Sequence, residues 1–447
     1  MVNSVLDRIH RPEPVGFWVR READETNMGL VLVLTYIALN LLSPGDMFPA
    51  LAPYKPLLIL AIFCLPALLF ARLQSPEIGK LRTQFILVML FFGWACCSWL
   101  PHGWFGGNLT TMLELGPNVM VYIMGVVLLR SPFKLGALRI VLVLVAMYVI
   151  ANAFAQIPYA QASHVSTPYV LASHDLFTQD VRIQGLGMLH DPNNFGQFLL
   201  LIVPLLYVSR RETGLGIGYL LTIPVTVLLL LGVYYTGSRG AEAGTAVLIG
   251  LYLVWRFKKV GAVFSVVVGS LLFLAINTFR TRTISMAGGM DRLAIWSDGM
   301  QFFKSSPVWG IGIRGYMDRN IMTAHNSYLL CAAELGMVGY FLWMSMVLVT
   351  LIQLNRVPKI VGQSNPGLAR WAVALSVSLS GYMFTSFFLS RTYDLPLFLL
   401  LGMSGAIVTE AGGDEAVPPG RGWPLWSFGL CVGILTLIYV LLRLRVV

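Results

Sequence analysis

Residues 324–343 read AHNSYLLCAAELGMVGYFLW, in which three polar residues stand directly before a long apolar run. After Ser327 this run holds a single charged side chain, Glu334, and it is long enough to enter the hydrocarbon core of a bilayer. The rest of the chain has the same character, because 57% of its residues are hydrophobic and only 12% are charged. The mean hydropathy of +0.74 lies outside the range of soluble proteins, so the sequence predicts an integral membrane protein.

Apolar runs recur along all 447 residues, and no polar block between them is long enough to fold as a soluble domain. We therefore predict an all-α polytopic protein with about 12–13 transmembrane helices in one domain over residues 28–447. Residues 1–27 are polar and lack the features of a cleaved signal peptide, so we expect a cytoplasmic segment followed by a retained span. The expected spans lie near residues 28–43, 56–71, 84–100, 115–130, 135–154, 195–209, 215–236, 241–255, 260–277, 326–353, 369–389, 395–408 and 425–442.

The distribution of Lys and Arg predicts which loops face the cytoplasm. The N-terminal segment and alternate loops up to residue 259 are basic, and basic residues near span ends stay on the cytoplasmic side. The intervening loops, including residues 156–194 and 278–325, are therefore expected on the opposite side. The pattern becomes contradictory after residue 400, which leaves the side of the C-terminus open.

The loop at 278–325 is unusually basic for a segment expected on that side. Its six basic residues stand against three aspartates, which indicates an anionic partner, and guanidinium groups suit phosphate oxygens. Contact with anionic lipid headgroups is the alternative explanation. The basic residues are Arg280, Arg282, Arg292, Lys304, Arg314 and Arg319.

An amphipathic helix is predicted within this loop. Leu293, Trp296, Met300 and Phe303 recur at helical spacing, so the helix would lie in the membrane interface with Arg292 in its first turn.

The stretch YYTGSRGAEAG, residues 234–244, predicts a second anion site. Gly237 and Gly240 permit a tight turn, Ser238 can cap the following helix, and Arg239 stands where helical N–H groups favour an anion. An arginine that snorkels from a helical hairpin is the alternative.

Taken together, SRG at 238–240, DRLAIWSDGMQFFKSSPVWGIGIRGY at 291–316 and HNSYLLCAAELGMVGYFLW at 325–343 resemble the O-antigen ligase and polymerase superfamily of bacterial membrane glycosyltransferases. The motif region, about residues 230–345, covers roughly a quarter of the chain. The resemblance implies a multi-pass fold similar to GT-C-type glycosyltransferases in the bacterial inner membrane. It also implies a glycan donor carried on undecaprenyl diphosphate and a reaction at the periplasmic face, without cofactor or obligatory metal.

By the same resemblance, Arg239 and Arg292 would bind the diphosphate and His325 would be the essential histidine. The chemistry agrees, because a glycosyl diphosphate needs charge neutralisation and one proton acceptor. Histidine has an ordinary pKa of about 6.5, and a helix N-terminus disfavours its charged form. Arg314 is a further candidate for phosphate contact. Arg391 is another, although it could equally pair with Asp394.

Three asparagines are candidates for glycan contact. In LHDPNNFG, Asp191 and Pro192 predict a helix start, and the family often carries an asparagine-bearing turn here, which nominates Asn193 and Asn194. For Asn326 a helix cap is favoured over a ligand.

Glu334 is expected to have a structural role, bonded to polar groups on neighbouring helices beside Gly336 and Gly339. A role in the site or in a proton path stays open.

The histidines and aspartates of the 156–194 loop match no standard ligand spacing, so no metal is predicted. They are His164, His174, Asp175, Asp180, His190 and Asp191. No nucleic-acid motif is present in the sequence.

The compact 278–325 loop favours a surface-polysaccharide polymerase, whose partners are the lipid-linked donor, an acceptor sugar hydroxyl and the bilayer. Ligation to lipid A core and transfer to a protein hydroxyl remain alternatives. A transporter would predict internal repeats or broken helices at mid-bilayer, and a scaffold would not need a histidine and arginines on one side. The sugar and the oligomeric state cannot be read from the sequence.

Overall fold

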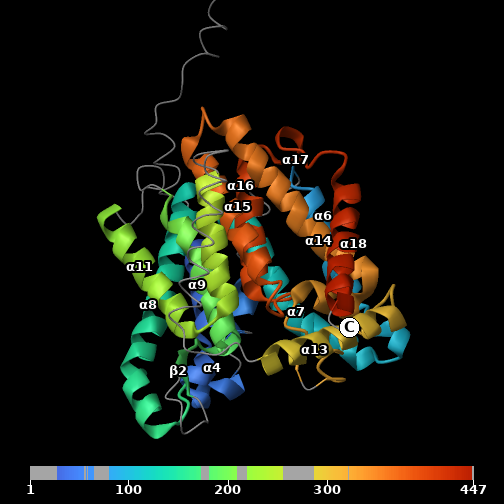
Figure 1. Cartoon of the computed structure of the whole chain (residues 1–447). Helices are drawn as coiled ribbons and strands as arrows, with labels where there is room; N and C mark the ends of the chain where they lie inside the picture. The colour runs from blue at the N-terminus through green and yellow to red at the C-terminus, as the bar shows by residue number, and fades with distance from the viewer. Residues whose placement is uncertain are drawn as a thin grey trace, which may run out of the picture.

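The computed structural model describes residues 28–54, 57, 59–64, 80–172, 181–208, 219–254, 286–320 and 322–444. Nearly all regular structure in these residues is helical, which confirms the predicted all-α class (Figure 1). The exception is a short antiparallel hairpin, β1 (Val170–Ala172) and β2 (Val181–Ile183), in which Leu171 lies opposite Arg182. The sequence did not predict this hairpin.

Five segments are long and apolar enough to cross a membrane: Thr83–His102, Phe105–Leu128, Pro132–Ser163, Ser327–Val361 and Trp423–Leu444. Each predicted span coincides with a helix, except that residues 260–277 and most of 56–71 lie outside the described residues. The helices are α3 (Met28–Leu42), α4 (Pro44–Met47), η1 (Pro49–Tyr54), α6 (Thr83–Cys96), η3 (Leu100–His102), α7 (Phe105–Leu128), α8 (Pro132–Ser163), η4 (Gly187–Leu189), α9 (Pro192–Leu206), α11 (Tyr219–Thr236), a helix over residues 239–254, α13 (Met286–Ser305), α14 (Ser327–Val361), α15 (Pro366–Thr385), α16 (Leu395–Glu410), α17 (Gly413–Ala416) and α18 (Trp423–Leu444).

The helix α16 lies at the centre of the bundle, and every residue from Leu395 to Thr409 is buried. It packs closely on α7, where a Cβ on Gly125 would lie only 2.8 Å from the Cα atom of Gly402. Small residues at such a crossing let two helix backbones approach and gain dispersion contacts, which matter most where lipid replaces water.

The helix α14 is broken at Gly336, whose φ of 64° is left-handed. The loop of residues 306–316 fills the break: the Ile311 and Gly312 amides donate to the Ala333 and Glu334 carbonyls, each at 3.0 Å. This close approach requires glycine at 310, because a Cβ there would lie 2.2 Å from the Glu334 carbonyl carbon. The loop therefore satisfies the backbone groups that the break releases.

The carboxylate of Glu334 is buried and accepts a hydrogen bond from the Tyr316 amide at 3.3 Å. Glu334 thus bonds the loop that fills the break and interacts with the Tyr393 side chain in the turn before α16, and its structural role stays a prediction.

The two ends of the bundle can be told apart by their contacts. At one end Arg130 pairs with Glu410 at 2.8 Å, and Asp414 accepts from the Thr83 amide at 2.8 Å. At the other end, the Lys304 Nζ of α13 lies 5.0 Å from the Tyr439 ring near the end of α18. The end of α18 therefore lies beside α13, at the end of the bundle opposite Asp414 (Figure 1). The charge pattern had left the side of this segment open.

The helix α13 lies across this end of the bundle (Figure 1). Its apolar stripe packs on the protein core, and the Trp296 indole donates to the Ala324 carbonyl at 2.9 Å. The sequence correctly predicted the stripe, but the stripe faces protein, whereas an interfacial helix would have turned it to lipid. Amphipathic periodicity alone cannot separate these two environments.

Candidate active site

Four helices begin around one site at the α13 end of the bundle: α9, the 239–254 helix, α14 and α16. Asp191 caps α9 by accepting from the Asn193 and Asn194 amides, at 2.8 and 3.2 Å. Ser238 and Asn326 cap the next two helices, as predicted. Because a helix N-terminus carries a partial positive charge and free N–H groups, this arrangement favours an anion.

His325 directly precedes Asn326, the N-cap of α14, and has a left-handed φ of 46°. Its amide donates to Thr323 Oγ1 at 3.4 Å, and Thr323 bonds Ser390 at 2.7 Å. Burial lowers the pKa of His325, and the charges of Arg292 and Arg391 lower it further, whereas Asp191 opposes them. The imidazole is therefore held in its neutral form, which can accept a proton.

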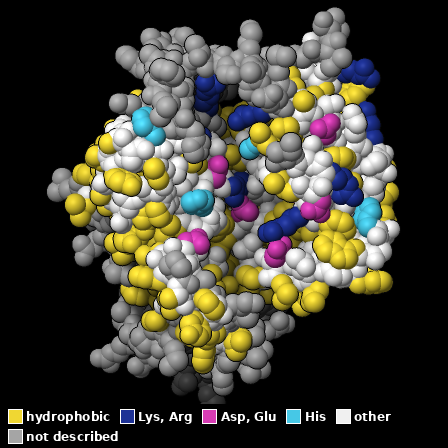
Figure 2. Space-filling model, turned by 90° about the horizontal axis from the view of Figure 1, so that it is seen from below, with side chains coloured by type: hydrophobic (Ala, Val, Ile, Leu, Met, Phe, Trp, Pro, Cys, Tyr) yellow, Lys and Arg dark blue, Asp and Glu magenta, His cyan; other side chains and the backbone are white. Residues whose placement is uncertain are grey.

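Arg239 and Arg292 lie close enough to repel each other. Partial burial and the charge of Arg239 lower the pKa of Arg292, although both side chains are still exposed. Within the described part of the chain, no carboxylate forms an ion pair with either guanidinium. Two adjacent cations that pair with no carboxylate of the described residues indicate a site for an added anion. Viewed from this end, charged and histidine side chains gather near the hollowed middle of the face (Figure 2).

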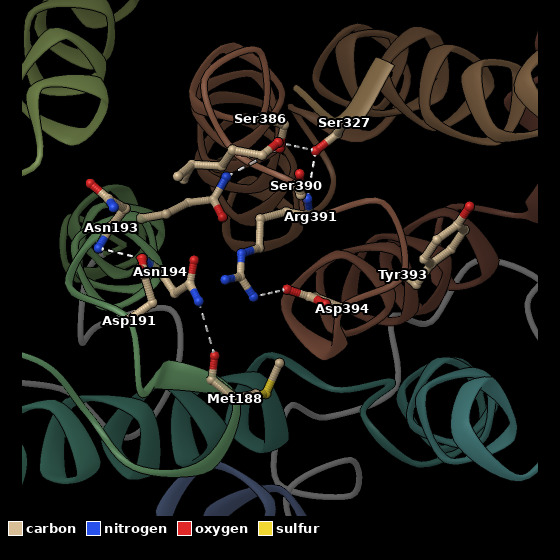
Figure 3. Close-up of polar contacts among 12 residues, drawn as sticks. Met188, Asp191, Asn193, Asn194, Ser327, Ser386, Ser390, Arg391, Tyr393 and Asp394 are labelled. Carbon is tan, nitrogen blue, oxygen red and sulfur yellow. Dashed lines mark hydrogen bonds and ion pairs between the residues drawn. The ribbon is translucent and has the colours of Figure 1, made fainter. Parts of the chain in front are cut away.

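Arg391 reaches the same site from the turn before α16. It pairs with Asp394, and its side chain lies between Asp394 and the first turn of α9 (Figure 3). The Arg391 amide donates to Ser327 Oγ at 2.6 Å, which ties this turn to the start of α14. The pairing with Asp394 considered from the sequence is thus present, and the guanidinium still acts on His325.

Arg314 is placed differently. Its Nε lies 2.9 Å from the Glu114 carboxylate of α7. Among the described residues, Arg314 is not one of the charged groups that shift the pKa of His325 or Arg292. A contact between Arg314 and phosphate remains a prediction.

All three candidate asparagines already bond to protein. The Asn193 Oδ1 accepts from Arg182 at 3.1 Å, and the Asn194 Nδ2 donates to the Met188 carbonyl at 3.5 Å (Figure 3). Asn326 is fully buried as a cap. Their contact with glycan stays a prediction. Sequence reasoning missed Arg182, and the only available signal was an arginine in a loop otherwise poor in basic residues.

No group of three or more His, Cys, Asp or Glu side chains that could hold a metal ion occurs in the ranges that the structure describes. Of the loop residues weighed as metal ligands, His174, Asp175 and Asp180 lie outside those ranges.

Residues 224–344 match a family described as O-antigen ligase. This chain carries an O-antigen ligase family domain. The match spans about a quarter of the chain and contains Arg239, Arg292 and His325, and it supports the membership of the O-antigen ligase and polymerase superfamily expected from the motifs. Asp191 and Arg391 lie outside the matched residues. A search of curated proteins found no match.

The surroundings of His325 predict how activity depends on pH. Asp191→Asn keeps a capping oxygen but removes the negative charge that stabilises imidazolium, so the pKa of His325 should fall further. The acid limb of the kcat/KM profile for glycan transfer should therefore move to lower pH. Asp318→Asn, in the exposed part of the 306–320 segment, is the matched control and should not move it. An acid limb that stays in place or moves upward in Asp191→Asn would contradict this electrostatic assignment.

Proposed function

We propose that this protein is a membrane glycosyltransferase of the bacterial inner membrane. It transfers a glycan from undecaprenyl diphosphate to an acceptor sugar hydroxyl at the periplasmic face. The observation that carries the proposal is the gathering of Arg239, Arg292 and His325 at one end of the bundle, inside a region that matches the O-antigen ligase family. The basic loops before residue 259 support a cytoplasmic location for the end of the bundle opposite His325.

The chemistry needs two tasks from the protein, which are removal of one proton and neutralisation of the departing diphosphate. The acceptor oxygen forms a bond to the anomeric carbon while the bond from that carbon to the diphosphate oxygen breaks. His325 accepts the hydroxyl proton, and the departing diphosphate takes the electron pair. Arg239 and Arg292 neutralise the charge that develops on it, with Arg391 as a third cation near the base. No metal is required in this proposal, because guanidinium groups supply the positive charge.

Polymerisation is proposed as the reaction type because the loop that carries α13 is compact. In that reaction the acceptor is a second lipid-linked glycan. Ligation to lipid A core is the second candidate, favoured by the description of the matched family.

The test is an incubation of the purified protein in nanodiscs with undecaprenyl-diphosphate-linked repeat units, with products resolved by glycan length. We expect a ladder of products from the wild-type protein and none from His325→Asn. Transfer only after lipid A core is added would establish ligation. Failure to transfer to lipid-linked glycan, lipid A core or protein acceptors would overturn the proposal.

A further inference from the structure

Arg182 is the middle residue of β2, and it lies beside two segments that carry site residues. Its Nε donates to the Thr236 carbonyl at 2.7 Å, and its Nη2 donates to Asn193 Oδ1 at 3.1 Å. Thr236 is the last residue of α11, and Gly237 and Ser238 form the turn that leads to Arg239, the first residue of the 239–254 helix. Asn193 lies in the first turn of α9, which Asp191 caps.

The start of α9 and the turn after α11 also pack tightly against each other. A Cβ on Gly196 of α9 would lie 2.9 Å from the Ala241 Cβ and 3.0 Å from Thr236 Oγ1. The Ser238 amide donates to the same Thr236 hydroxyl at 3.3 Å. A helix C-terminus also favours a cation, so the guanidinium is well placed at the last carbonyl of α11. The forked donors of arginine allow one side chain to hold both neighbours at once, which lysine cannot do in the same way.

We propose that Arg182 is a positioning residue that fixes the turn leading to Arg239 against the first turn of α9. The inference rests on the proposed function, because it concerns the alignment of the donor diphosphate with His325. Arg182 donates hydrogen bonds to two protein acceptors, and its role is to set where Arg239 stands. A displacement of about 1 Å between reacting groups can lower a rate by about 100-fold.

Arg182→Ala should therefore lower kcat for glycan transfer about 10- to 100-fold while the Kd for undecaprenyl diphosphate stays close to that of the wild type. Arg182→Lys should restore part of kcat, because it keeps one donor. Asn193→Leu removes the second acceptor, and its effect should not add to that of Arg182→Ala. Asn193→Asp keeps an acceptor for the guanidinium and should retain more activity than Asn193→Leu.

The matched control is Arg356→Ala, since Arg356 also donates to a backbone carbonyl, that of Pro418, but at the opposite end of the bundle. It should leave kcat unchanged. Thermal unfolding in detergent, compared with Arg182→Lys, separates misalignment from loss of fold.

The possible results separate a positioning role of Arg182 from direct donor binding and from no role. An unchanged kcat in folded Arg182→Ala would overturn the inference, as would full additivity with Asn193→Leu. A weakened donor Kd that accounts for the whole loss would show that Arg182 binds the donor directly, which also overturns a positioning role. If the wild-type protein transfers glycan to no acceptor, the proposed function fails and this inference falls with it. A wild-type enzyme that works and an Arg182→Ala enzyme that works equally well would refute only the inference.

Discussion

Replacing His325 should nearly abolish glycan transfer while leaving donor binding intact. The proposed reaction releases one proton from the acceptor hydroxyl, and general-base help of this kind contributes about 10²- to 10⁴-fold to kcat. His325 is held neutral by burial and by two neighbouring arginines, so it is ready to accept that proton. A fall in kcat of this size, without a matching rise in the Kd for undecaprenyl diphosphate, is the expected result.

The choice of variant matters because His325 has a left-handed φ of 46°. Asparagine tolerates this conformation better than alanine does, so His325→Asn removes the base with less backbone strain than His325→Ala. His164 offers a matched control, since it also has a positive φ, of 55°, and caps the end of α8. His164→Asn should leave kcat unchanged. Normal turnover by folded His325→Asn would exclude His325 as the base.

Removing either Arg239 or Arg292 should weaken use of the donor. A charge-assisted hydrogen bond to phosphate contributes about 1.5 to 3 kcal/mol, so kcat/KM should fall about 10- to 100-fold in each alanine variant. Lysine should rescue only part of this, because it presents a point charge where the guanidinium presents a fork. The double variant should lose less than the product of the two single losses, because both arginines bind one diphosphate.

For thermal stability without donor, we expect no loss when one of these two arginines is removed. Arg239 and Arg292 repel each other in the absence of donor, so Arg239→Ala should not lower the Tm of the protein without substrate. Added undecaprenyl diphosphate should raise the Tm of the wild type more than that of the variant. Arg443→Ala, at the same end of the bundle, is the control and should change neither quantity. Normal kcat/KM in both alanine variants would refute the phosphate-binding assignment.

Several local features could be read from the sequence because they depend on neighbouring residues alone. The spans follow from runs of apolar side chains, and the caps at Asp191, Ser238 and Asn326 follow from short polar side chains directly before such runs. Arg239 and Arg292 could be nominated because both stand at or near helix starts in segments expected on one side of the membrane.

The long-range contacts could not be read in this way. The approach of Arg391 to His325 joins two turns that are far apart in the chain, through the bond from the Arg391 amide to Ser327. Arg182 meets Thr236, 54 residues away, only because the hairpin folds over the end of α11. Likewise, the break in α14 depends on the 306–316 loop, which inserts at Gly336. Neither the sequence of the loop nor that of the helix predicts this contact by itself.

Hydropathy and charge act residue by residue, so the amino-acid sequence was enough to predict a helical membrane protein with a basic, histidine-bearing face. The charges that share the site are set by the fold, which brings Asp191, Arg292 and Arg391 to His325, pairs Arg314 with Glu114 and lays the end of α18 beside α13. Electrostatic interaction falls with distance in space, and the distance between helices is set by packing, which no single segment specifies.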